Sequence, residues 1–217
     1  MPRGTVSMKR DDMKKILLGM LDEYMDPVLK EERFTRRNNS LIYARKIGTT
    51  RQKIIMYFSS NPSYYPGAMM HIHPHFRISF PEINEKAREM TENMDYFVRN
   101  EKLTINQPIQ LCHKDVHEYW VMMDIGNREM LAQKIMDFLK KYTFPLLDEL
   151  KCGDDLIRCY EKRDERIMIS EQQYIYVASA YVLKGEYEKA LDALEMRFKA
   201  AGHRKYASVF HYIEDLL

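Results

Sequence analysis

Glycine, proline and cysteine are all scarce in this chain, and each shortage excludes a class of architecture. Eight Gly and eight Pro among 217 residues exclude collagen-like and low-complexity chains. Cys112, Cys152 and Cys159 are odd in number and form no CxxC pair, which indicates reduced thiols in a cytoplasm. No apolar run approaches the roughly 18 residues of a bilayer span, and the charged start MPRGTVSMKRDDMKK is not typical of a secretory signal. We therefore expect a cytoplasmic protein without a membrane segment.

Motifs that carry known chemistry are also missing. No serine lies in a G-x-S-x-G context, and no cysteine lies in a nucleophile motif. The chain has neither a P-loop nor a G-x-G-x-x-G loop, so a nucleotide cradle has no support. We expect a protein that is not an enzyme, with no catalytic residues and no cofactor.

Hydrophobic periodicity predicts a first part that mixes helices and strands. Apolar spacing predicts an amphipathic helix over 11–29, with Pro27 marking a kink or its approaching end. Gly48 allows a tight connection between two β-rich runs, which predicts a hairpin. A second helix is expected over 81–97. The expected strands are 39–47, 51–59, 70–80, 103–111 and 118–125.

The pattern from residue 127 to the end is helical. Ser170 and Gln173 have the spacing of a capping box, which predicts a helix start. Gly185 and Gly202 then separate three expected helices, which are 171–184, 187–200 and 204–216. The chain is therefore expected to be α+β, with an antiparallel or mixed sheet covered by helices. We place an α+β domain at 1–150 and an all-helical segment, packed on it, at 151–217.

Part of the helical segment resembles a tetratricopeptide repeat. The resemblance lies in YVASAYVLKGEYEKALDAL, about 171–200, through residues that are small or aromatic at the helix crossing: Ala178, Ala180, Tyr181, Gly185, Tyr187, Ala190 and Leu191. It covers one repeat and lacks the usual closing proline. One unit cannot build a concave peptide-binding surface, because several repeats must stack to make one. The resemblance implies a helical hairpin that packs on the domain, or else an element that docks a partner.

Residues 10–150 resemble a poorly characterised bacterial family of α+β domains of unknown function. The resemblance rests on Glu32-Arg33-Phe34-Thr35-Arg36-Arg37, on the hairpin over 41–58, on Glu118-Tyr119-Trp120 and on Phe144-Pro145-Leu146-Leu147. Such families are similar to immunity proteins, which neutralise bacterial toxins. The resemblance implies a toxin as a partner, and no catalytic residues accompany it.

Histidines form the clearest chemical candidate. His71, His73 and His75 share one face of the strand expected over 70–80, roughly 7 Å apart, and imidazoles so placed can hold a metal ion. His113, His117 and Cys112 could add ligands. The alternative is a polar strand face that faces solvent, since Pro74 disturbs the regular geometry and no carboxylate lies within the run.

Partner contact is predicted for a tyrosine loop and a basic hairpin. Tyr64 and Tyr65 lie in turn-rich sequence, where tyrosine offers contact area at low entropic cost, or else simply covers a sheet end. The predicted basic contact residues are Arg36, Arg37, Arg45 and Arg51. Residues 1–60 carry 13 Lys and Arg against 7 Asp and Glu, although the whole chain has a net charge of only +2. These residues could bind phosphates, or they could protect exposed strands from edge-to-edge association.

Three functions remain open from the sequence. The first is a non-catalytic protein-binding module, such as an immunity or antitoxin-like protein. The second is a metal-binding protein or metal-dependent hydrolase that uses the histidine strand. The third, and least favoured, is a nucleic-acid accessory protein that uses the basic hairpin.

Overall fold

The sheet and its helices confirm the predicted α+β class. The structure, a computed structural model, describes residues 8–113, 119–167 and 170–217. Within these ranges six strands form an antiparallel sheet, in the order β1-β2-β3-β4-β5, with β6 paired to β4. The strands are β1 (Thr35–Arg36), β2 (Ile42–Ile47), β3 (Thr50–Ser60), β4 (Met70–Ser79), β5 (Ile105–Pro108) and β6 (Trp120–Met122).

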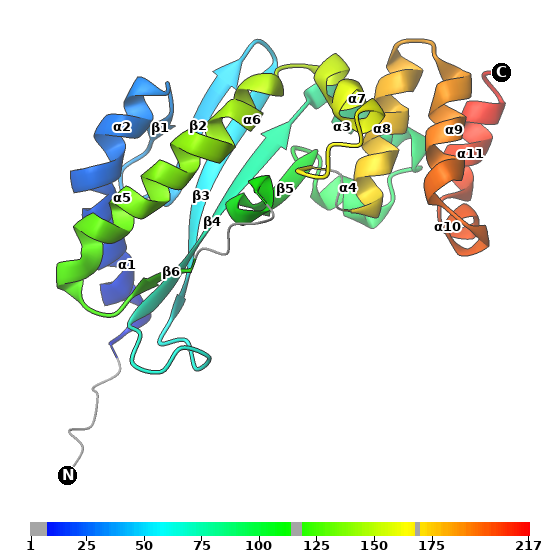
Figure 1. Cartoon of the computed structure of the whole chain (residues 1–217). Coiled ribbons are helices and arrows are strands. Elements are labelled where there is room, and N and C mark those ends of the chain that lie inside the picture. Colours follow the sequence, from blue (N-terminus) through cyan, green and yellow to red (C-terminus); the bar gives the residue numbers. More distant parts are fainter. Residues whose placement is uncertain (1–7, 114–118, 168–169) are drawn as a thin grey trace. The chain divides into compact units, whose positions relative to one another are not determined.

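Helices make up most of the remaining described chain (Figure 1). None of the helices in these ranges has the length and apolar character that crossing a bilayer requires. Two π-helical turns, at Leu21–Met25 and Leu139–Thr143, link consecutive helices. The helices are α1 (Arg10–Met20), α2 (Asp26–Glu31), α3 (Pro81–Met90), α4 (Asp95–Arg99), α5 (Arg128–Phe138), α6 (Phe144–Glu149), α7 (Gly153–Glu161), α8 (Glu171–Leu183), α9 (Tyr187–Arg197), α10 (Ala200–Lys205) and α11 (Ala207–Glu214).

The chain divides into two compact units, and each is built from separate stretches of sequence. Unit 1 consists of residues 1–45, 53–76 and 108–145, and unit 2 of residues 46–52, 77–107 and 146–217. Residues 77–107, predicted to belong with the rest of 1–150, therefore group with the C-terminal helices. The division does not follow the predicted boundary at residue 150.

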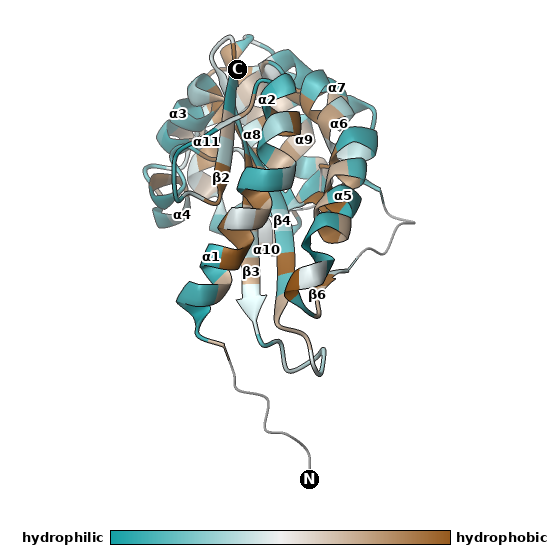
Figure 2. Ribbon diagram, turned by 90° about the vertical axis from the view of Figure 1, so that its left-hand side faces the viewer, coloured by the Kyte–Doolittle hydropathy of each residue, from teal (hydrophilic) through white to brown (hydrophobic). Residues whose placement is uncertain are grey.

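In unit 1, α1 and α5 pack against each other beside the sheet (Figure 1). Met13, Leu17 and Met20 are fully buried, as the predicted amphipathic spacing requires. Figure 2 shows the same division along α1 as brown and teal sides. Trp120 of β6 and Phe138 of α5 meet edge to face, with ring centres 5.4 Å apart.

Both prolines inside the helical runs of unit 1 follow a π-helical turn. Pro27 is the second residue of α2, directly after the turn Leu21–Met25. Pro145 is the second residue of α6, after the turn Leu139–Thr143. Proline has no N–H and its ring displaces the carbonyl one turn earlier, so a widened turn there removes the conflict. The kink or end predicted at Pro27 is thus a local widening of a helix that continues, and the turn before Pro145 is a second one.

In unit 2, α8 forms the centre of the helical packing. Nine of its 13 residues are buried, because α3, α7 and α9 all pack against it. The predicted capping box starts this helix, since the backbone N–H of Ser170 donates to Gln173 Oε1 at 3.0 Å. Helix α3, from the predicted first domain, also contacts α11, where the hydroxyl of Tyr212 donates to Glu89 Oε1 at 2.5 Å.

Two expectations for helix boundaries were wrong. The helix expected over 81–97 is two helices, α3 and α4, because Glu92 and Asn93 adopt left-handed backbone conformations that end a helix. The last segment contains four helices rather than three. Gly202 lies inside α10 and does not separate two helices; a Cβ there would lie 2.6 Å from the Phe198 ring.

Candidate functional site

Strand β4 places the predicted histidines opposite the core. Met70, Ile72 and Phe76 are fully buried on one face of the sheet, which confirms the predicted alternation. The opposite face is only partly open. His71 is 5% exposed, and His73 and His75 are half-buried.

His71 and His73 form a compact cluster with two hydroxyl groups. Their ring centres lie 3.9 Å apart, closer than the roughly 7 Å spacing of side chains on one strand face, because the rings lean together. The Tyr64 hydroxyl lies 2.9 Å from His71 Nδ1 and 3.5 Å from His73 Nε2. Ser59 Oγ lies 3.1 Å from His73 Nε2. We call these four residues the histidine cluster.

The surroundings of the histidine cluster favour neutral imidazoles. Burial lowers the pKa of His71 below its usual value, and the neighbouring His73 lowers it further. Burial also lowers the pKa of His73. Nε2 of His71 is buried without a hydrogen-bond partner among the described residues. A second proton on His71 would therefore be poorly accommodated.

The predicted metal ligands do not come together as a set of three. His75 lies beside Tyr57 instead, with ring centres 5.0 Å apart in an edge-to-face contact. Within the described ranges, no three His, Cys, Asp or Glu side chains are placed to share a metal ion. His113 lies against Tyr142, at 4.5 Å between ring centres. His117 lies outside the described residues, and metal binding by this strand stays a prediction.

Exposed aromatic and apolar side chains lie beside His71 and in the segments that flank it, 64–67 and 119–123. Tyr64 is 61% exposed and Tyr119 is 67% exposed, and the rings of both lie within 6.0 Å of the His71 ring. Tyr65 and Met123 are exposed as well, and the Met123 methyl lies 3.5 Å from where a Cβ at Gly67 would be. The tyrosine loop is thus part of a wider surface. We call Tyr64, Tyr65, Tyr119 and Met123 the tyrosine surface.

Arg36 differs from its predicted role as a contact residue. Its side chain is only 5% exposed, and its Nε and Nη2 donate to the Asp26 carboxylate at 3.0 and 2.7 Å. It also pairs with Asp22 and donates to the carbonyl of Ser40 at 3.0 Å. The Tyr43 hydroxyl donates to Asp26 Oδ1 at 2.5 Å. Because these contacts occupy its guanidinium, Arg36 stabilises unit 1 and is not available to a partner.

The other predicted basic residues have varied surroundings. Arg45 is half-buried, with its guanidinium 4.6 Å from the centre of the Phe34 ring. Arg37, in unit 1, and Arg51, in unit 2, are exposed. The sequence therefore predicted one role for Arg36, whose side chain is buried, and for Arg37 and Arg51, which are exposed.

Tyr119 and Met123 are the members of the tyrosine surface that sequence reasoning missed. Both flank β6 and were expected to be part of a regular strand over 118–125. Strand β6 spans only Trp120–Met122, which leaves the residues on either side exposed. Their residue types alone do not distinguish a contact surface from a core, because tyrosine and methionine are common in both.

Comparison with known proteins finds no matching family model, no matching curated protein and no matching solved structure. The resemblances described from the sequence therefore stay predictions.

Proposed function

We propose that this chain is a non-catalytic protein-binding module that uses the tyrosine surface of unit 1. The observation that supports the proposal is the exposure of Tyr64, Tyr65, Tyr119 and Met123, of which Tyr64 and Tyr119 lie beside the His71 ring. Tyrosine and methionine are enriched in protein interfaces, where they supply large contact areas. The hydrogen bond between Tyr64 and His71 holds one of these rings in place before binding, which lowers the entropic cost of association.

The class of partner in this proposal is a bacterial toxin. It rests on the resemblance of residues 10–150 to immunity-protein-like domains. An immunity protein acts by covering a surface of its toxin, so it needs exposed contact groups and no catalytic machinery of its own.

Capture of partners from the native host tests this proposal. The triple variant Tyr65→Ala, Tyr119→Ala and Met123→Ala removes three members of the surface and keeps the Tyr64–His71 hydrogen bond. A matched triple variant, Ile42→Ala, Val98→Ala and Leu183→Ala, removes exposed apolar side chains elsewhere, which are 40%, 43% and 46% exposed.

The wild type and the matched variant should capture one protein in stoichiometric amount, and the surface variant should lose it. The purified partner should lose its own activity when it is mixed with the wild type. Equal capture by all three proteins would show that the tyrosine surface is not the interface. Capture of a partner whose activity is unchanged would remove the toxin-neutralising role.

A further inference from the structure

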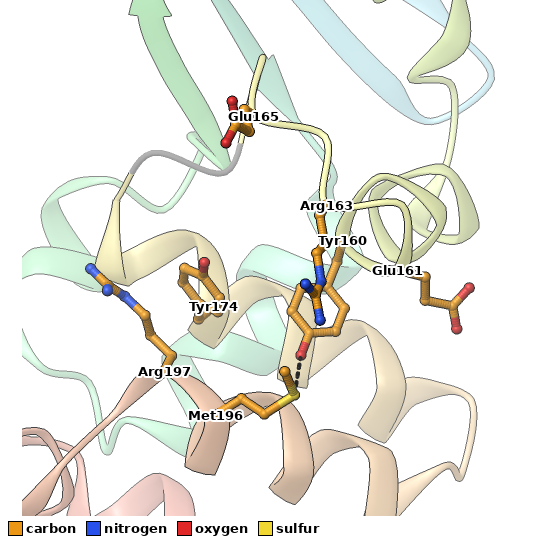
Figure 3. A pocket seen from close by; sticks show the side chains of 7 residues that line it. All are labelled: Tyr160, Glu161, Arg163, Glu165, Tyr174, Met196 and Arg197. Atoms are coloured by element: carbon orange, nitrogen blue, oxygen red, sulfur yellow. Dashed lines mark hydrogen bonds between the residues drawn. The ribbon is translucent and has the colours of Figure 1, made fainter.

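A pocket of about 480 Å³ opens among the helices of unit 2. It lies where the end of α7, the first half of α8 and the end of α9 meet (Figure 3). Its size falls within the usual range of small-ligand sites. Seven residues line it: Tyr160, Glu161, Arg163, Glu165, Tyr174, Met196 and Arg197.

Apolar and aromatic groups form the walls of this pocket. The rings of Tyr160 and Tyr174 meet nearly at right angles, with centres 6.1 Å apart. The Tyr160 hydroxyl donates to Met196 Sδ at 3.8 Å, which holds that ring in position. Figure 3 shows the hydroxyl directed at the sulfur. These three side chains offer a surface that suits an aromatic or aliphatic body.

Two guanidinium groups among the described lining residues form no salt bridge. Arg197 lies over the Tyr174 ring, at 5.3 Å from its centre. Neither Arg197 nor Arg163 forms a salt bridge or a side-chain hydrogen bond within the described ranges. Arg197 does lie near Glu171, because the pKa of that carboxyl is lowered mainly by a hydrogen bond from Lys205 and, to a smaller extent, by the charge of Arg197. The nearby arginines behave differently, because Arg158 pairs with Asp155 at 2.7 Å and Arg166 pairs with two carboxylates. The charge of Arg163, and the part of the Arg197 charge that Glu171 does not balance, can attract an anionic ligand.

The acidic lining residues limit which anion fits. Tyr181 donates to Glu161 Oε1 at 3.1 Å, and Figure 3 shows that carboxylate directed away from the Tyr160 and Tyr174 rings. Glu165 lies at the rim. Two nearby carboxylates disfavour a dianion such as a phosphate monoester more than they disfavour a singly charged carboxylate.

The backbone of Arg163 ends helix α7. Its φ is +52°, a left-handed conformation that favours glycine, and it follows the last turn of α7. Its N–H donates to the carbonyl of Tyr160, and the N–H of Asp164 donates to the carbonyl of Cys159, both at 2.9 Å. Glycine occupies the same position after α8, at Gly185. This helix end fixes the backbone position from which the Arg163 side chain reaches the pocket.

We propose that this pocket binds a carboxylate carried on an aromatic or apolar body. Arg163 and Arg197, whose guanidinium groups Figure 3 shows on either side of the Tyr174 ring, attract the acid, and Tyr160, Tyr174 and Met196 contact the body. Arginine binds carboxylates through paired, charge-assisted hydrogen bonds, which gives both affinity and orientation. The acid is a free small molecule or the carboxyl terminus of a peptide. The site lies entirely in unit 2, so it is independent of the function proposed above.

Titration with small probes tests the proposal, with the Met196 methyl resonance of the whole chain as the reporter. The probes are 3-phenylpropionate, its neutral amide 3-phenylpropionamide, phenyl phosphate, and acetyl-Gly-Phe with a free carboxyl terminus. We expect 3-phenylpropionate to bind at least ~10-fold more tightly than the amide, the factor that one charge-assisted pair supplies. Phenyl phosphate should bind more weakly than 3-phenylpropionate. Tighter binding of the peptide than of 3-phenylpropionate would assign a peptide source, and the reverse order a free acid.

Variants separate binding from folding. Arg163→Gly and Arg197→Gln should each weaken 3-phenylpropionate binding about 10-fold. Arg163→Gly should also raise Tm, because glycine relieves the left-handed strain. The matched control is Arg33→Gly, since Arg33 follows α2 of unit 1 with a φ of +63° and the same pair of backbone hydrogen bonds. It should raise Tm and leave binding unchanged.

Equal binding of 3-phenylpropionate and its amide would overturn the proposal. So would tighter binding of phenyl phosphate, or wild-type affinity in both Arg163→Gly and Arg197→Gln.

Discussion

The histidine pair of unit 1 has a hydrogen-bond arrangement that resists protonation. Nδ1 of His71 lies 2.9 Å from the Tyr64 hydroxyl, and Nε2 is buried without a partner among the described residues. A charged imidazole needs an acceptor at both nitrogens, so charging His71 would leave one N–H unsatisfied. The His73 ring, 3.9 Å away, would add charge repulsion if it were protonated too.

We therefore predict that unit 1 loses stability in mild acid. Both histidines have a lowered pKa in the folded protein, so the unfolded chain binds more protons below its own histidine pKa of about 6.5. The contribution of the two neutral histidines to the free energy of unfolding should be complete above pH 6.5. It should be lost as the pH falls from 6.5 through the lowered pKa values.

Chemical denaturation at a series of pH values measures this contribution. His73→Gln should flatten the dependence. NMR titration of either histidine above pH 6.5 would contradict the prediction.

Arg36 illustrates how a charged residue becomes part of the interior. Burial alone raises the pKa of Asp26, but hydrogen bonds from Arg36 and Tyr43 outweigh it, and the net pKa is below its usual value. This contribution to stability is therefore present above about pH 4 and is lost as pH falls through the lowered pKa. Loss of Arg36 would leave the Asp26 carboxylate with the Tyr43 hydroxyl but without its charged partner.

We predict that Arg36→Ala destabilises the protein by about 1–3 kcal/mol, the cost of removing one partner from a charged hydrogen-bond network that is partly open to solvent. Arg37→Ala, next to it but exposed, should change the free energy of unfolding by less than about 0.5 kcal/mol. Urea denaturation of the two variants at pH 7 provides the measurement. Equal effects would show that the Arg36 network does not contribute.

At the scale of elements, helix ends decide much of this fold. Helices α2, α3, α7 and α8 all end with a left-handed residue and the same two backbone hydrogen bonds. The left-handed residues are Arg33, Glu92, Arg163 and Gly185. Glycine is the residue that signals such an end in a sequence, because it alone adopts this conformation without strain. The end at Gly185 was predicted, whereas the end at Glu92 was missed and α3 and α4 were merged.

Two glycines within helices should respond to the same substitution in opposite ways. At Gly19, in α1, an added Cβ meets no atom closer than 4.0 Å, so Gly19→Ala should stabilise the protein by up to about 1 kcal/mol. At Gly202, in α10, a Cβ would lie 2.6 Å from Phe198, which packs against Tyr206. Gly202→Ala should destabilise the protein by about 1–3 kcal/mol through overpacking. Thermal unfolding of both variants measures whether each substitution raises or lowers stability. Stabilisation by Gly202→Ala would contradict the prediction.

At the scale of the whole molecule, charge does not favour nucleic acid. The net charge is +2, and the most basic stretch of the sequence includes Arg36, which two aspartates already neutralise. Binding to nucleic acid draws on several phosphate contacts made by free Lys and Arg on one surface.

We predict that the protein forms no complex with a single-stranded RNA oligonucleotide even at about 50 mM salt, where counterion release favours binding. A gel-shift titration measures this, with poly-lysine as a positive control for the RNA. A complex that dissociates as salt increases would revive the nucleic-acid hypothesis.

The sequence alone determined the features that depend on neighbouring residues. The α+β class, the alternation along β4, the hairpin at Gly48 and the start of α8 at Ser170 all follow from local spacing and backbone preference. Such signals extend over a few residues, so a pattern in one segment is enough to predict them.

Only the tertiary structure decided which distant residues meet. It joined residues 77–107 to the C-terminal helices, buried Arg36 against Asp22 and Asp26, and placed the Tyr64 hydroxyl on His71. It also brought Arg163 and Arg197 to one pocket, although 33 positions separate them in the sequence. These contacts depend on how whole elements pack, because burial and pairing are properties of surfaces that form only when the chain has folded.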